Sequence, residues 1–166
     1  MKRLILIRHA KSSWSEPGLS DRDRPLNARG RTAAEKIGRW LADNGHAPGQ
    51  VLSSPARRCR ETWERIAAQL NAPPEPELID RLYLADPDEM LATLKAAAEG
   101  SVVMLGHMPG IGEFARALRR DPPPRHDIFR KYPTGGMLIL DFAADSWESI
   151  LPGTGRLVAW ITPRTL

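Results

Sequence analysis

Short apolar runs alternate along this chain with longer segments in which apolar residues recur at helical spacing. The clearest run is Leu4-Ile5-Leu6-Ile7, which predicts a buried strand over residues 3–8. Further strands are expected at 51–53, 101–106, 137–142 and 157–162, with helices at 28–44, 56–71, 87–99 and 110–120. This alternation predicts a single α/β domain over residues 1–166, with a mostly parallel central sheet and helices on both faces.

Local signals support two of the helix predictions. Over residues 28–44, Ala33, Ile37, Trp40 and Leu41 share one face, and Asn44-Gly45 is typical of a helix end. The helix over 87–99 follows Asp86-Pro87, a good N-cap followed by proline at the first helical position. Residues 10–25 and the proline-rich stretches at 72–76 and 121–124 are expected to be loops within the one domain.

The composition is typical of a globular protein with one core. The chain has 166 residues, of which 42% are hydrophobic and 27% charged, and no apolar run approaches the ~20 residues of a membrane span. The apolar run before Arg8 is too short for a secretory signal, and the single Cys59 cannot form an internal disulfide. We therefore expect a cytoplasmic protein, without membrane association, that acts as a monomer.

The charge balance favours an anionic substrate over nucleic acid. The net charge is +4, but the basic residues are scattered and mixed with acids, as in Asp21-Arg22-Asp23-Arg24. No pattern of a known nucleic-acid-binding motif is present, so nucleic-acid binding is not expected. A modest positive charge attracts anions, and a phosphorylated substrate fits that requirement.

Three predicted strands end in residues suited to phosphoryl chemistry. The first strand ends in Arg8-His9, the second in Ser53-Ser54-Pro55 just before Arg58, and the strand at 101–106 is followed by His107. By themselves, Arg8 and His9 favour a strand end that simply reaches water, with two polar residues starting a loop. Because ligands of open α/β sheets bind outside the carboxyl ends of strands, the three ends together predict one site. Arginine matches phosphate geometry, and histidine supplies a nucleophilic nitrogen.

These segments resemble the histidine phosphatase superfamily with its phosphoglycerate mutase-like fold, and within it the SixA-type phosphohistidine phosphatases. The similarity runs in order along nearly the whole chain, through Arg8-His9-Ala10-Lys11-Ser12-Ser13-Trp14, Arg24-Pro25-Leu26-Asn27-Ala28-Arg29-Gly30, Ser53-Ser54-Pro55-Ala56-Arg57-Arg58-Cys59-Arg60-Glu61-Thr62-Trp63 and Leu105-Gly106-His107-Met108-Pro109-Gly110. The resemblance implies a three-layer sandwich. It also implies a phosphatase that needs neither metal nor cofactor.

The resemblance assigns roles to four residues. His9 stands where the family has its nucleophile, while Arg8, Arg58 and His107 stand where the family builds its phosphate pocket. A transferring phosphoryl group spreads negative charge over its equatorial oxygens, and preorganised cationic donors lower that barrier. His9 must present an unprotonated nitrogen, and the like charge of Arg8 and Arg58 is expected to lower its pKa.

Three further residues carry weaker expectations for substrate binding. Ser15 falls where many relatives place an asparagine that touches the phosphate, and Met108 could offer only its backbone N–H. Both also fit ordinary loop positions. Arg24 could gate the pocket mouth, or it could simply pair with Asp21 and Asp23.

A general acid is the least defined part of the predicted site. Phosphomonoesterase relatives use an acid to protonate an alcohol leaving group. The segment 78–83 resembles the part of phosphoglycerate mutases that carries this acid, which makes Asp80 the candidate. An exposed Asp80 paired with Arg81 or another base is the alternative, and Asp86 and Glu89 are other possible acids.

The preferred function is phosphatase activity through a covalent phospho-His9 intermediate, with a phosphohistidine, including one carried by a protein, as substrate. Loops between the motifs are short, which leaves little room for a lid and would admit a protein surface. A small-molecule phosphomonoesterase of the same superfamily is the first alternative. A non-catalytic module that binds phosphorylated partners is the second, although such a module would not need a nucleophile.

Overall fold

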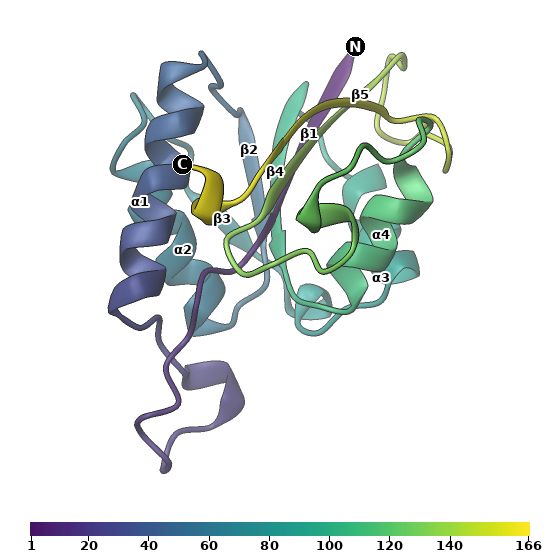
Figure 1. Ribbon diagram of the computed structural model, residues 1–166. Coiled ribbons are helices and arrows are strands. Elements are labelled where there is room, and N and C mark those ends of the chain that lie inside the picture. Colours follow the sequence, from purple (N-terminus) through teal and green to yellow (C-terminus); the bar gives the residue numbers. More distant parts are fainter.

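The computed structural model describes residues 1–166 and contains one six-stranded sheet in the order β3-β2-β4-β1-β5-β6. The strands are β1 (Lys2–Arg8), β2 (Gln50–Ser53), β3 (Pro76–Leu78), β4 (Ser101–Gly106), β5 (Met137–Phe142) and β6 (Arg156–Ile161). β3, β2, β4 and β1 are parallel, β5 is antiparallel to β1, and β6 is antiparallel to β5. The predicted mostly parallel sheet is confirmed (Figure 1).

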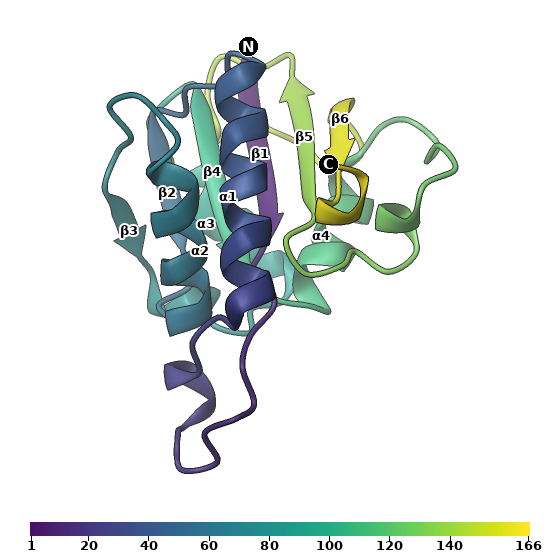
Figure 2. The same ribbon diagram turned by 60° about the vertical axis from the view of Figure 1, so that its left-hand side comes forward.

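Helices cover both faces of this sheet, as Figures 1 and 2 show. On one face lie α1 (Ala28–Asp43) and α2 (Arg57–Ala67), and on the other lie α3 (Pro87–Lys95) and α4 (Gly110–Leu118). Four short 3₁₀ turns complete the fold: η1 (Asp21–Asp23), η2 (Asp80–Leu82), η3 (Asp127–Phe129) and η4 (Pro163–Thr165). The three-layer sandwich is thus confirmed, and none of its helices is long and apolar enough to cross a membrane.

The unbroken apolar run of β1 follows from its central place between the two helix layers. Leu4 and Leu6 pack into the core on the α3 and α4 side, whereas Ile5 and Ile7 pack into the core on the α1 and α2 side. All four side chains are fully buried. A strand with water on one face would alternate apolar and polar residues, but a strand covered on both faces must be apolar throughout. The run therefore ends where the sheet ends, at Arg8.

Side-chain caps define the beginnings of α1 and α3. The Asn27 side-chain oxygen accepts a hydrogen bond from the Gly30 N–H at 2.8 Å, and Asp86 Oδ1 accepts one from the Glu89 N–H at 2.9 Å. The inward face of α1 differs from the prediction, because Ala34 is buried with Ile37 and Leu41 while Ala33 and Trp40 are only half-buried.

Two helices end earlier than the hydrophobic pattern predicts. α3 ends at Lys95 instead of residue 99, because the Ala98 and Glu99 N–H groups donate to Gln50 Oε1 at 2.9 and 3.1 Å. α2 ends at Ala67 instead of residue 71, where i→i+3 hydrogen bonds replace the helical ones. In both cases local turn bonds or a contact from another element replace the intrahelical ladder.

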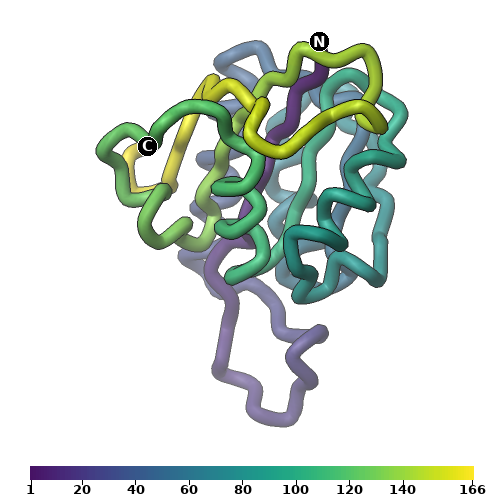
Figure 3. The backbone as a smooth tube through the Cα atoms, turned by 90° about the vertical axis from the view of Figure 1, so that its right-hand side faces the viewer, coloured from purple at the N-terminus to yellow at the C-terminus, as the bar shows by residue number.

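The strand β3 was not predicted, since its first residue, Pro76, is the last of a proline-rich stretch expected to be a loop. It is three residues long and pairs only with β2 at the edge of the sheet. Pro76 is its first residue, a position that tolerates proline because a backbone N–H is not required there. The segment between β1 and α1 projects well beyond the carboxyl ends of the parallel strands, as Figure 3 shows.

Candidate active site

The carboxyl ends of β1 and β4 and the start of α2, the helix that follows β2, border one cleft of about 380 Å³. Its walls come from the strand ends, the projecting segment and the first turn of α2. The residues that line it are Arg8, His9, Lys11, Ser12, Trp14, Arg24, Arg58, Leu84, His107, Met108 and Thr134. The cleft therefore brings together all four residues that the sequence motifs singled out, and none of its lining residues is acidic.

Backbone contacts hold His9 rigidly at the end of β1. Its N–H donates to the Gly106 carbonyl at 3.2 Å, and the next N–H, that of Ala10, donates to Thr62 Oγ1 at 2.9 Å. Thr62 in turn donates to the Arg58 carbonyl at 2.7 Å, which explains a threonine four residues after Arg58. This one hydroxyl ties the strand carrying His9 to the helix carrying Arg58.

A glycine in α1 lets the chain pass close behind His9. A Cβ at position 30 would lie 2.1 Å from the Lys11 carbonyl oxygen, so only glycine fits there. The Asn27 N–H also donates to the Lys11 carbonyl, at 3.0 Å. The motif Asn27-Ala28-Arg29-Gly30 thus fixes the backbone that follows the nucleophile position.

The His9 ring is held in one tautomer. Its Nδ1 lies 2.7 Å from the Ala10 carbonyl oxygen, which can only accept, so Nδ1 carries the proton and Nε2 is left unprotonated. Burial lowers the pKa of His9 to about 3, and the charges of Arg58 and Arg8 act in the same direction. Like charge was expected to lower this pKa, but burial is the larger cause. The imidazole is therefore neutral and nucleophilic at neutral pH.

Arg58 lies at the centre of the cleft, whereas its neighbours point elsewhere. Its side chain is only 3% exposed, while Arg57 pairs with Glu61 at 2.9 Å on the helix surface. The Arg60 Nε–H donates to the Pro55 carbonyl at 3.0 Å. Only the second of the three basic residues in this turn thus faces the strand ends, as the motif predicts.

Asp21 orients the Arg58 guanidinium, and its carboxylate was not singled out for this role from the sequence. Arg58 Nη2 donates to Asp21 Oδ2 at 3.0 Å, and Nη1 donates to the Asp21 carbonyl at 2.7 Å. The Tyr83 hydroxyl and the Arg24 guanidinium donate to the same carboxylate. These donors, the Tyr83 hydroxyl first, lower the pKa of Asp21 to about 2, so Asp21 is an acceptor rather than a proton source.

Arg8 borders the other side of the nucleophile. Its Nη1 donates to the Tyr132 carbonyl at 3.0 Å, and its backbone N–H donates to the Gly136 carbonyl at 3.0 Å. Protein contacts use only part of each guanidinium, because Arg8 Nη2 donates to no protein group and Arg58 Nη1 donates one of its two N–H groups. Each guanidinium therefore keeps a donor for the oxygens of a phosphoryl group.

His107 faces His9 across the cleft, with ring centroids 5.3 Å apart. Arg58 Nη2 donates to His107 Nδ1 at 3.3 Å, so the proton lies on Nε2, which donates to Ser54 Oγ at 2.7 Å. Burial first and the charge of Arg58 second lower the pKa of His107 to about 4. Cys59, 3.7 Å from Nε2, is fully buried, and burial raises its thiol pKa to about 12. That thiol is not a second nucleophile.

Of the residues predicted to bind substrate, Arg24 lies in the cleft and Ser15 lies outside it. Arg24 lines the cleft and also pairs with Asp21 at 3.2 Å, while a gating role stays a prediction. Its guanidinium lies 3.5 Å from the centroid of the Trp14 ring. Ser15 is exposed and outside the cleft lining, and its Oγ bonds to Ser13 Oγ at 2.8 Å.

Asp80 does not reach the cleft. It belongs to η2, its side chain is 88% exposed, and its nearest cation is Arg22 at 3.5 Å. Asp86 caps α3, so its carboxylate is engaged with a backbone N–H. The structure thus brings no predicted acid to the nucleophile, and it groups no three His, Cys, Asp or Glu side chains in a way that could hold a metal ion.

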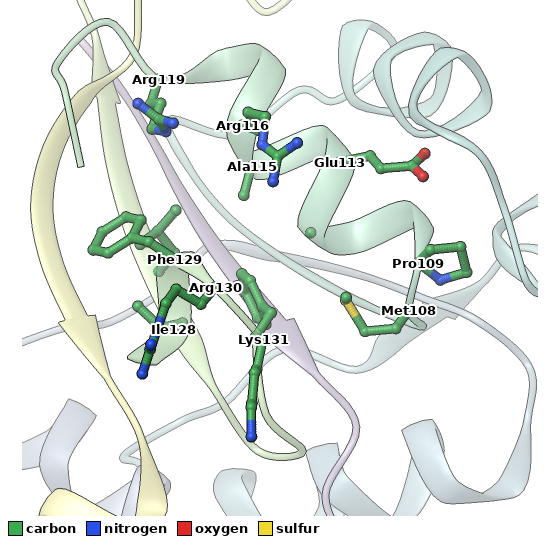
Figure 4. Close-up of a pocket in the computed structure, with 13 residues that line it drawn as sticks. Met108, Pro109, Glu113, Ala115, Arg116, Arg119, Ile128, Phe129, Arg130 and Lys131 are labelled. Atoms are coloured by element: carbon green, nitrogen blue, oxygen red, sulfur yellow. The ribbon is translucent and has the colours of Figure 1, made fainter. Parts of the chain in front are cut away.

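Met108 separates the cleft from a second, smaller pocket of about 240 Å³ between α4 and the residues around η3. Figure 4 shows its side chain at one end of this pocket, with Arg119 at the other end. A Cβ at position 112 would lie 3.0 Å from the Met108 sulfur, so the side chain packs toward α4. A backbone contact with phosphate is therefore the role left open for Met108.

The sequence model of the histidine phosphatase superfamily (branch 1) matches residues 4–83. A structure from Agrobacterium tumefaciens assigned as phosphohistidine phosphatase SixA is 30% identical, covers 98% of both chains and has a TM-score of 0.78. The chain belongs to the histidine phosphatase superfamily. A SixA structure from Nakamurella multipartitia is 28% identical with a TM-score of 0.81, over 98% of this chain and 96% of that one. An uncharacterized chloroplastic protein of Arabidopsis thaliana is 46% identical over 98% of this chain and 78% of its own length.

Membership of this superfamily makes the protein a hydrolase of phosphoryl groups. Among the residues that line its cleft, five had no role predicted from the sequence: Lys11, Ser12, Trp14, Leu84 and Thr134. Trp14 and Leu84 are 78% and 57% exposed, although both are large and apolar. Their sequence signal was weak, because an apolar residue in a polar loop is common, and only the fold places both at the mouth of one cleft.

Proposed function

We propose that this protein hydrolyses phosphohistidine through a covalent intermediate on His9. The observation that carries the proposal is the state of the His9 ring, whose Nδ1–H is bound to the Ala10 carbonyl. The free Nε2 lone pair belongs to a buried, neutral imidazole beside two arginines that each keep an unused Nη donor. This arrangement suits attack on a phosphorus atom whose oxygens bind Arg8 and Arg58.

The reaction balances in two steps. In the first, His9 Nε2 forms a bond to phosphorus while the bond between phosphorus and the substrate imidazole nitrogen breaks. The departing imidazole takes a proton from water and leaves neutral. In the second step, water attacks the phospho-His9 phosphorus and gives a proton back to solvent, the P–Nε2 bond breaks, and inorganic phosphate is released. Arg8 and Arg58 hold the phosphoryl oxygens in both steps, and the Ala10 carbonyl keeps the ring in position.

The absence of an acidic side chain from the cleft lining favours phosphohistidine over an alkyl phosphate ester. An alkoxide is a poor leaving group without a positioned acid, which typically contributes ~10²–10⁴-fold in rate. Imidazole needs no such residue, because solvent can protonate it. Asp21, the carboxylate bound to Arg58, has a pKa of about 2 and carries no proton to give.

The mouth of the cleft supports a protein as the source of the phosphohistidine. Trp14 stands exposed on the projecting segment and Leu84 stands exposed shortly after η2, and both line the cleft. Exposed aromatic side chains next to a pocket are typical of surfaces that bind other proteins. A pocket built for a small ester would instead enclose its ligand.

A turnover panel tests this function. Phosphate release is measured with a phosphohistidine peptide, phosphoramidate, an aryl phosphate and an alkyl phosphate. We expect rapid release from the two P–N compounds and slower release from the aryl ester. The alkyl ester is expected to be slower by ~10²-fold or more. Equal turnover of alkyl ester and phosphohistidine would favour the small-molecule phosphomonoesterase instead.

A further inference from the structure

A third cavity, a groove of about 740 Å³ that is larger than the catalytic cleft, lies directly beside that cleft. It is bordered by the first half of α1, the segment from η3 to β5, and the C-terminal turn η4. Figure 2 shows η4 and this segment next to α1. Lys11 and Thr134 line both the groove and the cleft, so the two form one continuous depression.

The groove is strongly basic. Five cationic side chains line it against one acid, Asp127, and these cations are Lys11, Arg29, Lys36, Lys131 and Arg164. Asp127 is already paired with Arg130 at 2.9 Å and lies 3.9 Å from Arg164. The other four lining cations have no carboxylate partner within ion-pair distance. Cations on this face are therefore available to an outside anion.

The opposite edge of the sheet has a different charge. The pocket beside β3 is lined by Glu64 and Glu75 and by a single cation, Arg60, whose Nε–H is bound to the Pro55 carbonyl. The pocket across Met108 from the cleft is also basic, because Arg116, Arg119, Arg130 and Lys131 line it with one acid, Glu113. The β3 edge is thus the less basic side, and the groove is the larger of the two basic cavities that adjoin the cleft.

We propose that this groove binds an acidic segment of the phosphorylated protein substrate, so that substrate choice depends on charge next to the phosphohistidine. The inference rests on the proposed function for the phosphoryl group, and it adds the class of partner. Continuity through Lys11 and Thr134 allows one polypeptide to place its phosphohistidine in the cleft and its acidic residues along α1. Complementary charge of this kind raises association rates by ~10–10³-fold.

A protein fits the groove better than a nucleic acid. None of the residues lining it is aromatic, so it offers no platform on which bases could stack. The cations are also spread over four separate segments around a hollow, and they do not form a stripe that follows a phosphate backbone. Asp and Glu side chains can reach such dispersed cations individually.

The test uses a double charge reversal, Arg29→Glu with Lys131→Glu. Both side chains are exposed, and neither residue lines the catalytic cleft. Its matched control is Arg39→Glu with Lys95→Glu, which changes the net charge equally outside both cavities. Arg39 lies about three helical turns from Arg29 on the same helix. Circular dichroism and thermal melting confirm that both variants fold.

Three substrates are compared by kcat/KM: a phosphohistidine peptide with acidic flanks, the same peptide with Asp and Glu replaced by Asn and Gln, and phosphoramidate. We expect the groove variant to lose ~10-fold on the acidic peptide and to match the wild type on the other two. The control variant should resemble the wild type throughout. Unchanged kcat/KM on the acidic peptide, or an equal loss on all three substrates, would overturn the inference.

Binding measurements separate this inference from the proposed function. Fluorescence anisotropy with the labelled, unphosphorylated acidic peptide reports the groove even if no P–N compound is hydrolysed. If binding is ~10-fold weaker in the groove variant but unchanged in the control, the groove binds acidic segments, whether or not the protein hydrolyses phosphohistidine. A single-stranded oligonucleotide that binds more tightly than the peptide, and is lost in the groove variant, would assign the groove to nucleic acid and reject the inference.

Discussion

The cleft and the neighbouring groove are both basic, but they use charge in opposite ways. In the cleft, Arg58 is 3% exposed and held by Asp21 and His107, so its position is set before any ligand arrives. In the groove, Arg29 and Lys131 are exposed and have no ion-pair partner. Burial makes a cation rigid and strong enough to stabilise a transition state, whereas exposure leaves it able to attract a partner but not to direct chemistry.

Removing the nucleophile should have the largest effect and should affect only the cleft. We expect His9→Ala to lower turnover by ~10⁴-fold or more, because no second nucleophile is available. The fold should persist, since His9 stands at a strand end. Acid-labile phosphate trapped by rapid quenching of the wild type, measured by mass spectrometry, should be missing from the variant. Trapped phosphate in His9→Ala would mean that another residue carries the phosphoryl group.

The next largest effect should be the dependence of turnover on the leaving group of the substrate. Asp80→Asn is expected to leave phosphohistidine turnover nearly unchanged, because Asp80 is exposed and bound to Arg22 outside the cleft. The ratio of phosphohistidine to alkyl phosphate turnover should stay at ~10²-fold or more in both proteins. Steady-state kinetics with both substrates measure this ratio. Loss of activity on every substrate in Asp80→Asn would place the general acid there after all.

Buried and exposed arginines on one helix give a direct comparison. Arg58→Ala should lower kcat/KM by ~10²–10³-fold, because a preorganised donor to the phosphoryl oxygens is lost. Arg57→Ala is the matched control, since it removes only a surface pair with Glu61 worth less than ~1 kcal/mol of stability. The two variants are compared on phosphoramidate, which does not reach the groove. The opposite ranking would show that the wrong arginine has been assigned to the cleft.

Acid should destabilise the protein through the two cleft histidines. Their pKa values are lowered to about 3 for His9 and about 4 for His107, from an ordinary 6.5. The unfolded chain therefore binds more protons below pH 6.5, and stability falls as the pH falls from 6.5 toward these values. At pH 5 each histidine should account for about 2 kcal/mol of lost stability relative to pH 7.

Chemical denaturation at pH 7 and pH 5 measures this loss. The His9→Ala variant should lose about 2 kcal/mol less than the wild type over this interval, because it lacks one of the two buried groups. The His46 side chain, away from the cleft, is left intact in both proteins. An equal loss in variant and wild type would show that His9 titrates normally and is not buried as described.

The smallest effect is expected from salt concentration, which should weaken peptide binding at the groove more than chemistry in the cleft. Exposed charges are screened over about 8 Å at physiological ionic strength, whereas buried ones are screened much less. Raising the salt concentration from ~0.05 to ~0.5 M should lower kcat/KM for the acidic phosphohistidine peptide several-fold and change that for phosphoramidate less. The groove variant should lose this difference. Equal salt dependence of both substrates would contradict separate roles for the two regions.

Much of the layout could be predicted from local sequence. The apolar run of β1, the caps at Asn27 and Asp86, and the three strand ends each carry a short-range signal, because they depend on a few neighbouring residues. The edge strand β3 carried none, since three residues beginning with Pro76 become a strand only by pairing with β2. The early ends of α2 and α3 likewise depend on hydrogen bonds that the hydrophobic pattern does not contain.

Local signals and long-range contacts also contribute differently to the active site. The sequence by itself determined which residue types meet at the strand ends, because Arg8, His9, Arg58 and His107 each follow a strand or open a helix. Only the tertiary structure decided how they act, since the Ala10 carbonyl selects the tautomer of His9 and Asp21 fixes Arg58 from 37 residues away. It alone also joined α1 and η4 into a basic groove. Burial and long-range pairing set protonation and orientation, and neither can be read from neighbouring residues.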